Sequence, residues 1–169
     1  VTEHRRQRRR AWLVAGLAFV LCGAGKVHAA ECAVTTVGLN FGDYDPSVTG
    51  PDDSVGTVTV TCQYVPKGAT QVNYRVTISN GTNGTSPTTR QMGTGSARLG
   101  YNVFADPARS QVWGTGTGGT VIASGSMTIG PGVGNGTRTT THAVYGRIPQ
   151  LQDAVPGAYN DTLLVTLTY

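Results

Sequence analysis

The stretch that decides the fold class is Pro156-Gly157-Ala158-Tyr159-Asn160-Asp161-Thr162-Leu163-Leu164-Val165-Thr166-Leu167-Thr168-Tyr169. Its first two residues signal a turn, because proline presets φ and glycine accepts a positive φ. Apolar and polar residues then alternate with the two-residue period of a β-strand. This pattern predicts a core-facing side made of Tyr159, Leu163, Val165, Leu167 and Tyr169. Chain ends are usually polar and frayed, so an aromatic last residue in phase with this side predicts a paired strand with Tyr169 buried. No further strand follows in the sequence, which makes the neighbour of this strand the question for function.

The same alternation recurs upstream in short runs separated by turn signals. No helical periodicity is sustained after the leader, and charged residues make up only 13% of the chain, about half the usual share. About eight short strands of this kind predict an all-β sandwich. We see no repeat or linker, so residues 30–169 are predicted to form one domain. The clearest runs are residues 33–41, 55–63, 71–79, 98–106 and 139–148, with shorter candidates at 90–92, 121–122 and 126–129.

Residues 1–29 have the pattern of a secretory signal peptide. A cluster of five arginines precedes an apolar run over residues 11–21, which is too short to span a bilayer. Small residues at Val27 and Ala29 predict cleavage before Ala30. Lipid attachment at Cys22 is disfavoured, because Leu21 stands where such sites need a small residue. We therefore expect an exported protein with no membrane span after cleavage.

Net charge gives no support for nucleic-acid binding. The leader holds six of the 13 Lys and Arg residues and one of the nine Asp and Glu residues. The mature chain then has seven basic and eight acidic residues, a net charge of −1. Nucleic-acid binding needs clustered Lys and Arg, and no cluster remains.

Two cysteines, Cys32 and Cys62, remain after cleavage. Two thiols in an exported chain predict one disulfide. The alternative is a pair of buried free thiols. Closing a loop of this length contributes roughly 3–4 kcal/mol of stability in the chain-entropy model.

Residues suited to catalysis are sparse in the mature chain. His142 is its one histidine, and both triads and zinc sites need a histidine with partners in space. Flanked by threonines on a predicted strand, it is interpreted as a surface or structural residue. The glycine-rich run 114–119 lacks the following helix and the lysine of a phosphate loop, so it is interpreted as a surface loop. The sequence argues against a secreted hydrolase and predicts no enzyme activity and no cofactor.

Two further groups of residues have a functional and a structural interpretation. Asp43, Asp45, Asp52 and Asp53 form a loose acidic cluster with oxygen ligands for Ca²⁺, but solvated loop carboxylates are the commoner case, so no metal site is predicted. Trp113 and Tyr101 have the ring faces that stack on sugars, yet core packing is the commoner fate of such residues.

Several segments resemble the spore coat protein U domain family in order and spacing over nearly all of the mature chain. Leu39-Asn40-Phe41-Gly42-Asp43-Tyr44-Asp45-Pro46 is similar to the family's segment after its first cysteine, and residues 56–62 to its second-cysteine strand. Residues 98–104 are similar to its central segment. Residues 144–149, 156–161 and the last strand resemble its C-terminal signature.

The resemblance implies an exported structural subunit of an archaic chaperone–usher pilus or of a spore or cell coat. Such subunits have an immunoglobulin-like sandwich that lacks its last strand. A periplasmic chaperone, then a neighbouring subunit delivered at the outer-membrane usher, supplies the missing strand. On this interpretation the chain passes through the periplasm to the cell surface. The edge that meets the chaperone or donor strand is then expected at Leu163, Val165, Leu167 and Tyr169.

One departure from the family bears on position in the polymer. Polymerising members carry a donor extension before the first cysteine, whereas only Ala30 and Glu31 precede Cys32 after the predicted cleavage. This favours a terminal or tip subunit, for which a receptor or glycan would be a further partner. The alternative function is a self-sufficient secreted carbohydrate-binding or adhesin sandwich. The two hypotheses differ in whether the domain is stable alone.

Overall fold

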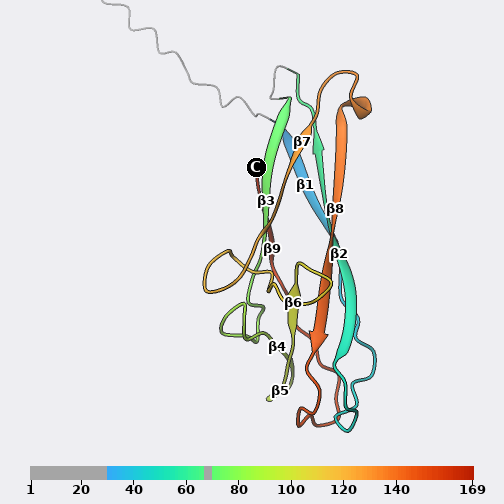
Figure 1. Cartoon of the computed structure of the whole chain (residues 1–169), viewed down its shortest axis with the longest axis vertical. Helices are drawn as coiled ribbons and strands as arrows, with labels where there is room; N and C mark the ends of the chain where they lie inside the picture. The colour runs from blue at the N-terminus through green and yellow to red at the C-terminus, as the bar shows by residue number, and fades with distance from the viewer. Residues whose placement is uncertain (1–29, 67–69) are drawn as a thin grey trace, which may run out of the picture.

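A computed structural model of the chain describes residues 30–66 and 70–169, which form an elongated β-sandwich (Figure 1). The predicted signal peptide, residues 1–29, lies outside the described residues, and so does the alternative of lipid on Cys22. Within the described part, no helix is long and apolar enough to cross a bilayer.

The first sheet has four antiparallel strands in the order β1-β2-β8-β6. The central pair of this sheet is β2–β8, which is paired from Asp52 opposite Ile148 to Gln63 opposite Thr137. β1 is an edge strand that pairs with β2. The strands are β1 (Glu31–Val37), β2 (Asp52–Gln63), β6 (Asn102–Phe104) and β8 (Thr137–Ile148).

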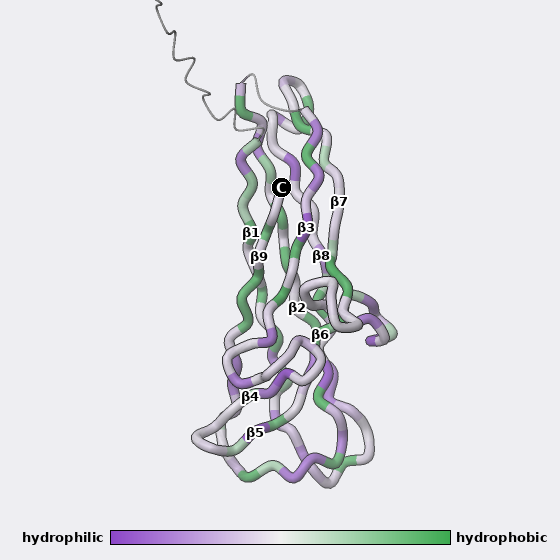
Figure 2. Tube along the Cα trace, turned by 90° about the vertical axis from the view of Figure 1, so that its left-hand side faces the viewer, coloured by the Kyte–Doolittle hydropathy of each residue, from purple (hydrophilic) through white to green (hydrophobic). Residues whose placement is uncertain are grey.

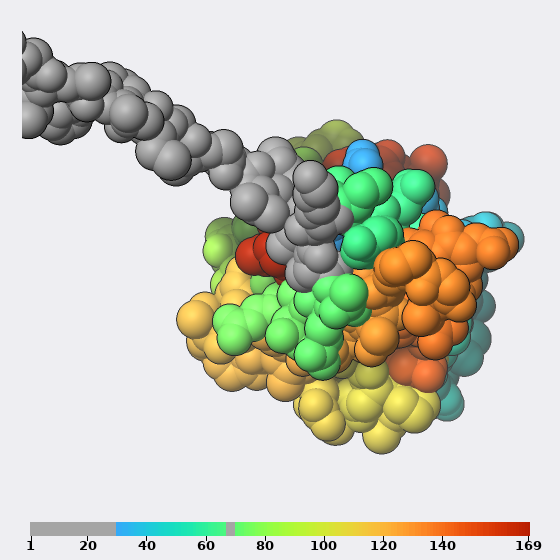
Figure 3. Space-filling view, turned by 90° about the horizontal axis from the view of Figure 1, so that it is seen from above, coloured from blue at the N-terminus to red at the C-terminus, as the bar shows by residue number. Residues whose placement is uncertain are grey.

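The second sheet has three strands in the order β7-β3-β9, and a separate hairpin of β4 and β5 extends one end of the molecule. That end is the lower one in Figure 1, while the end of β2, the start of β3 and the β7–β8 connection gather at the upper end seen in Figure 3. A short 3-10 turn, η1 (Gly134–Gly136), precedes β8. The remaining strands are β3 (Gln71–Ile78), β4 (Gln91–Thr94), β5 (Ala97–Gly100), β7 (Ala123–Thr128) and β9 (Val165–Thr168).

The strand order is that of an immunoglobulin-like sandwich. β1, β2, β8 and β6 occupy the positions of strands A, B, E and D, while β3 and β9 occupy those of C and F. The position of strand G, beside β9, is filled by no strand of the described residues. Both β1 and β9 are therefore edge strands.

The core forms where the inward sides of the two sheets meet. Alternate residues of β2 and β3 are buried, as the two-residue period requires, while their neighbours face solvent. Figure 2 shows the same alternation along the strands. The fully buried side chains include Val58, Val60, Cys62, Val76, Ile78, Val103, Trp113, Ile129 and Ile148.

The predicted all-β sandwich is confirmed, but two predicted strands have different bounds. β1 ends at Val37 instead of residue 41, because Leu39 and Phe41 leave the sheet and pack over Gly146. A Cβ at Gly146 would lie 2.8 Å from atoms of both side chains, so a larger residue there would force the two side chains to shift. The predicted strand 98–106 divides at Tyr101, whose N–H donates to the Arg90 carbonyl (3.1 Å).

The last strand is shorter than the sequence pattern predicts. β9 covers Val165–Thr168, and residues 159–164 form the segment that leads into it. Leu163, Val165 and Leu167 are half-buried, in keeping with the alternation. The expectation of a buried Tyr169 is wrong: its side chain is 54% exposed, because β9 ends at Thr168 opposite Arg75.

Candidate binding groove between the two sheets

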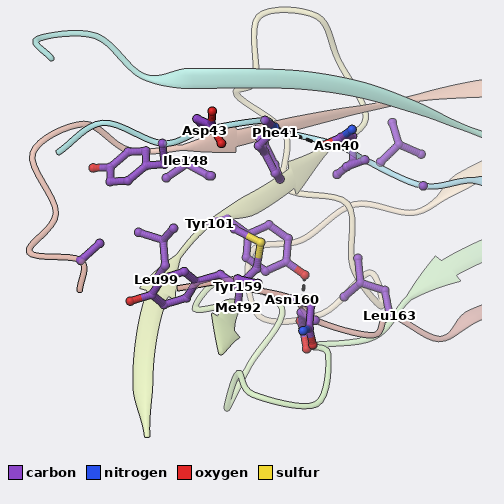
Figure 4. Close-up of a pocket in the computed structure, with 18 of the residues that line it drawn as sticks. Asn40, Phe41, Asp43, Met92, Leu99, Tyr101, Ile148, Tyr159, Asn160 and Leu163 are labelled. Atoms are coloured by element: carbon purple, nitrogen blue, oxygen red, sulfur yellow. Dashed lines mark hydrogen bonds between the residues drawn. The ribbon is translucent and has the colours of Figure 1, made fainter. Parts of the chain in front are cut away.

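A groove of about 960 Å³ opens between β1 and β9. One rim is formed by residues 36–44 and 46, which continue from the end of β1. The other is formed by residues 154–161, 163 and 165, which lead into β9. Figure 2 shows that β1 and β9 lie on the same side of the molecule, and Figure 4 shows the lower part of the space between the rims. The groove therefore lies beside the unfilled strand position.

The groove is lined mainly by apolar side chains. Its base is made of buried core residues from both sheets, and its rims carry half-buried side chains whose outer surfaces face solvent. An apolar cleft that solvent reaches favours association with another apolar surface. The apolar base residues are Val58, Ile78, Met92, Leu99, Tyr101, Val144 and Ile148, and the half-buried rim residues are Leu39, Phe41, Tyr44, Ala154, Tyr159, Leu163 and Val165.

The free edge of β9 presents unpaired backbone groups to the same opening. The Leu164 carbonyl accepts from the Ser79 N–H (3.0 Å), and the Leu164 N–H donates to Ser79 Oγ (2.9 Å). The backbone groups of Leu164 therefore face the β3 side. Backbone groups of successive residues point to opposite sides of an antiparallel strand. The N–H and C=O groups of Val165 and Leu167 therefore point away from β3, toward the unfilled position.

The lead-in segment of β9 is fixed to the rest of the molecule at two residues. Asn160 exchanges backbone hydrogen bonds with Gly93, with N···O distances of 2.8 and 3.1 Å. The Asp161 carboxylate accepts from the Thr82 N–H (2.8 Å), Thr82 Oγ1 (2.7 Å) and the Tyr101 hydroxyl (2.8 Å). These bonds hold the β9 rim of the groove against β4 and the β3–β4 loop.

The same hydrogen bonds set the protonation of this rim. Burial raises the pKa of Asp161, but the bonds from Thr82 and Tyr101 outweigh it, and the pKa lies below its ordinary value. Burial, followed by the bond to Asp161, raises the pKa of the Tyr101 hydroxyl. At neutral pH the pair is therefore a carboxylate that accepts from a neutral phenol.

The edge strand β1 is held to its sheet by the disulfide. Cys32 and Cys62 lie directly opposite each other on β1 and β2, and their sulfur atoms are bonded. The predicted disulfide is therefore present, and it ties the edge strand β1 to the centre of its sheet.

The structure places the other candidate residues away from any catalytic arrangement. His142 is half-buried and its Nε2 lies 2.9 Å from the Tyr74 hydroxyl, with the ring edge-on to Trp113. Burial lowers the pKa of His142. Trp113 and Tyr101 are 1% and 7% exposed, so neither ring is free to stack on a sugar. Residues 114–119 form a loop that is not followed by a helix.

The four aspartates do not converge. Asp53 belongs to β2, not to a loop as predicted, and pairs with Arg147 opposite it (2.7 and 2.8 Å). Asp45 accepts from Ser47 in a local turn. In residues 30–66 and 70–169, no three His, Cys, Asp or Glu side chains are grouped to hold a metal ion.

Some residues that shape the groove gave a weaker signal in the sequence. Leu39 and Phe41 alternate like strand residues, but in the structure they pack closely over Gly146, which is far away in the sequence. The Tyr101–Asp161 pair joins residues 60 positions apart. Asp161 belongs to the segment that resembles the C-terminal signature of the family. No residue near it in the sequence indicates that Tyr101 is its partner.

Comparison with known proteins agrees with this geometry. The family model of the spore coat protein U domain matches residues 19–166. The chain belongs to the spore coat protein U domain family. Protein U of Myxococcus xanthus is 29% identical over 137 residues, which cover 78% of this chain and 71% of that protein.

A solved structure shares the fold of this family member. It is the crystal structure of the CsuC–CsuE chaperone–tip adhesion subunit pre-assembly complex from the archaic chaperone–usher Csu pili of Acinetobacter baumannii. The match has a TM-score of 0.51 and 20% identity, and it covers 83% of this chain and 40% of the matched chain. This chain thus corresponds to less than half the length of its structural neighbour.

Proposed function

We propose that this protein is a structural subunit of a surface pilus or coat, completed by a β-strand that another protein donates. The observation that carries the proposal is the apolar groove beside β9. It combines an unfilled strand position, unpaired backbone groups at Val165 and Leu167, and half-buried apolar side chains on both rims. An extended segment bound there would add main-chain hydrogen bonds and insert alternate side chains.

The energetic gain from filling the groove is large relative to the stability of a domain. Four or five apolar side chains, at roughly 1.5–3 kcal/mol each, give a gross gain on the order of 10 kcal/mol. Whole domains are stable by about 5–15 kcal/mol. Even after the entropy of ordering the segment is subtracted, completion would decide whether the folded state persists. Open apolar edges also promote aggregation, so a chaperone is needed before assembly.

The comparisons support partners of this kind. The chain belongs to the spore coat protein U domain family, and its fold matches a chain from a chaperone–tip adhesion subunit complex. We infer that a periplasmic chaperone occupies the groove first and that a neighbouring subunit replaces it at an outer-membrane usher. The protein would then reside at the cell surface. The predicted terminal or tip position, with a receptor or glycan as ligand, stays a prediction.

Co-expression tests the proposal directly. The chain with its leader is produced in the bacterial periplasm, alone or together with a cognate periplasmic chaperone. We expect aggregation or degradation of the chain alone and a soluble one-to-one complex with the chaperone. A stable monomer that ignores the chaperone would contradict strand donation and favour the self-sufficient binding module.

A further inference from the structure

The two ends of the groove have different chemistry. The upper end, next to β1 and β9, is lined mainly by stiff β-branched residues, whose χ1 angles are restricted, and Leu39 and Leu163 also contribute to the groove. The lower end is lined by aromatic rings, a methionine and two other aliphatic side chains. The upper set is Thr36, Val37, Val58, Val144 and Val165, and the lower set, here called the lower pocket, is Phe41, Met92, Leu99, Tyr101, Ile148 and Tyr159.

The lower pocket has two walls with open space between them. Figure 4 shows Phe41 and Ile148 on one wall and Met92, Leu99 and Tyr159 on the other. The Phe41 and Tyr101 rings meet edge to face with centroids 6.2 Å apart, so one aromatic contact joins the lining of the lower pocket. The walls therefore define a compartment within the groove.

Hydrogen bonds fix the tyrosine rings of the lower pocket, which suits it to binding a rigid, bulky side chain. The Tyr159 hydroxyl donates to the Val155 carbonyl (2.9 Å), and the Tyr101 hydroxyl donates to Asp161, so both rings are oriented without a guest. Met92 is the adaptable member, because its unbranched chain changes shape easily and its sulfur contacts aromatic rings favourably. Aromatic guests prefer the edge-to-face and offset contacts that such rings offer.

We propose that the donated strand carries one aromatic side chain that enters the lower pocket, followed along the strand by small or β-branched residues at the upper end. This inference rests on the proposed function and specifies the chemistry of the partner. The occupant is an extended segment of another polypeptide, most simply of a neighbouring subunit. Because the lower pocket brings several aromatic rings and a methionine together at one end of the groove, a ring that prefers it would fix the register of the incoming strand.

A series of covalently linked donors tests the register. A flexible linker and an alternating Val/Thr donor strand are appended after Tyr169, and a single Phe replaces each inward Val in turn, in both strand directions. We expect one Phe position to raise Tm well above the all-Val donor, and the other positions to match or lower it. For the same donors as free peptides, the preferred position should bind on the order of 100-fold tighter than its Ala counterpart.

A variant of the pocket provides the control. Ala154 lies on the rim that lines the groove, so Ala154→Trp should fill the space of the guest ring. The variant should abolish the advantage of the Phe donor and leave the all-Val donor effective, which also shows that it folds. Ala33→Trp, on the exposed side of β1, should leave the Phe advantage intact.

The outcomes separate this inference from the proposed function. If no donor raises Tm above that of the chain without one, strand donation itself is wrong. If all donors stabilise equally wherever the Phe stands, or if Ala154→Trp leaves the Phe advantage unchanged, the aromatic register is wrong and strand donation stands.

Discussion

Arg90 shows how a single buried side chain organises the base of the sandwich. It is 1% exposed and has no carboxylate among its hydrogen-bond partners. Its guanidinium instead donates to backbone carbonyls from three segments and to one amide. Burial lowers its pKa to about 10, so the group stays charged at neutral pH. The acceptors are the carbonyls of Ile78, Ser79, Pro87 and Trp113 and the Asn102 side chain.

Replacing this residue should therefore be costly. Arg90→Met should lower the free energy of unfolding by roughly 3 kcal/mol or more, because several buried carbonyls lose their donor at about 1–3 kcal/mol each. Arg75→Met, at an exposed position of β3, should change it by no more than about 0.5 kcal/mol. Urea unfolding of both variants in the chaperone-bound or donor-completed form measures the difference. Equal effects would show that the Arg90 bonds add little.

His142 gives the fold a pH dependence with a defined sign. Its folded pKa lies below the ordinary value of 6.5 because the ring is partly buried. As pH falls through about 6.5, the unfolded chain binds a proton that the folded chain resists, so stability should decline until the folded pKa is passed. His142→Gln should flatten the stability profile between pH 7.5 and 5.5. An unchanged slope in that variant would place the titrating group elsewhere.

At the scale of elements, successive side chains of the four-residue strand β9 point to opposite sides, one toward the groove and the next toward solvent. Val165 lines the groove and is half-buried, whereas the neighbouring Thr166 is exposed on the outer side. Val165→Lys should weaken chaperone or donor binding by more than about tenfold, because a charge would enter an apolar groove. Thr166→Lys, with the same added charge one residue away, should have little effect. Affinity measurements on the two variants decide whether this strand faces the partner.

The disulfide acts on the opposite edge. It joins β1 to β2 at directly paired positions 30 residues apart in the sequence. Cys32→Ser with Cys62→Ser should reduce stability by roughly 2–4 kcal/mol. Thiol labelling of the unreduced, denatured wild type should find no free cysteine after removal of the leader. Full labelling would contradict the bond.

The elements also show which features the sequence can predict. Long alternating runs such as β2 and β3 were predictable within a few residues, because burial on one face imposes the two-residue period. The departure of Leu39 and Phe41 from β1 was not, since these side chains pack over a glycine more than 100 residues away in the sequence. The groove was predictable as an unfilled neighbour of the last strand. Its aromatic lower end was not, because it gathers side chains from β4, β5, β8 and three connecting segments.

At the scale of the whole molecule, the open position beside β9 leaves the second sheet with less strand pairing than the first. The first sheet contains the long β2–β8 pair, whereas β9 makes only four paired positions with β3. The outer groups of Val165 and Leu167 have no strand to bond within the described residues. Stability should accordingly be lowest along β9 and the groove, and highest around β2 and β8.

Hydrogen exchange makes this asymmetry measurable. In the chain without a partner, the amides of Val165 and Leu167 should exchange rapidly, because they point toward the open edge, while those of central β2 residues should be protected. A linker and an apolar donor strand appended after Tyr169 should protect both β9 amides and convert an aggregation-prone chain into a monomer with a higher Tm. The amide of Thr166 points toward β3 and provides the internal comparison. Its protection from exchange should rise only as far as the global stability does. If the chain alone already protects Val165 and Leu167 and melts cooperatively at a temperature that the donor leaves unchanged, the groove is not a strand-binding site.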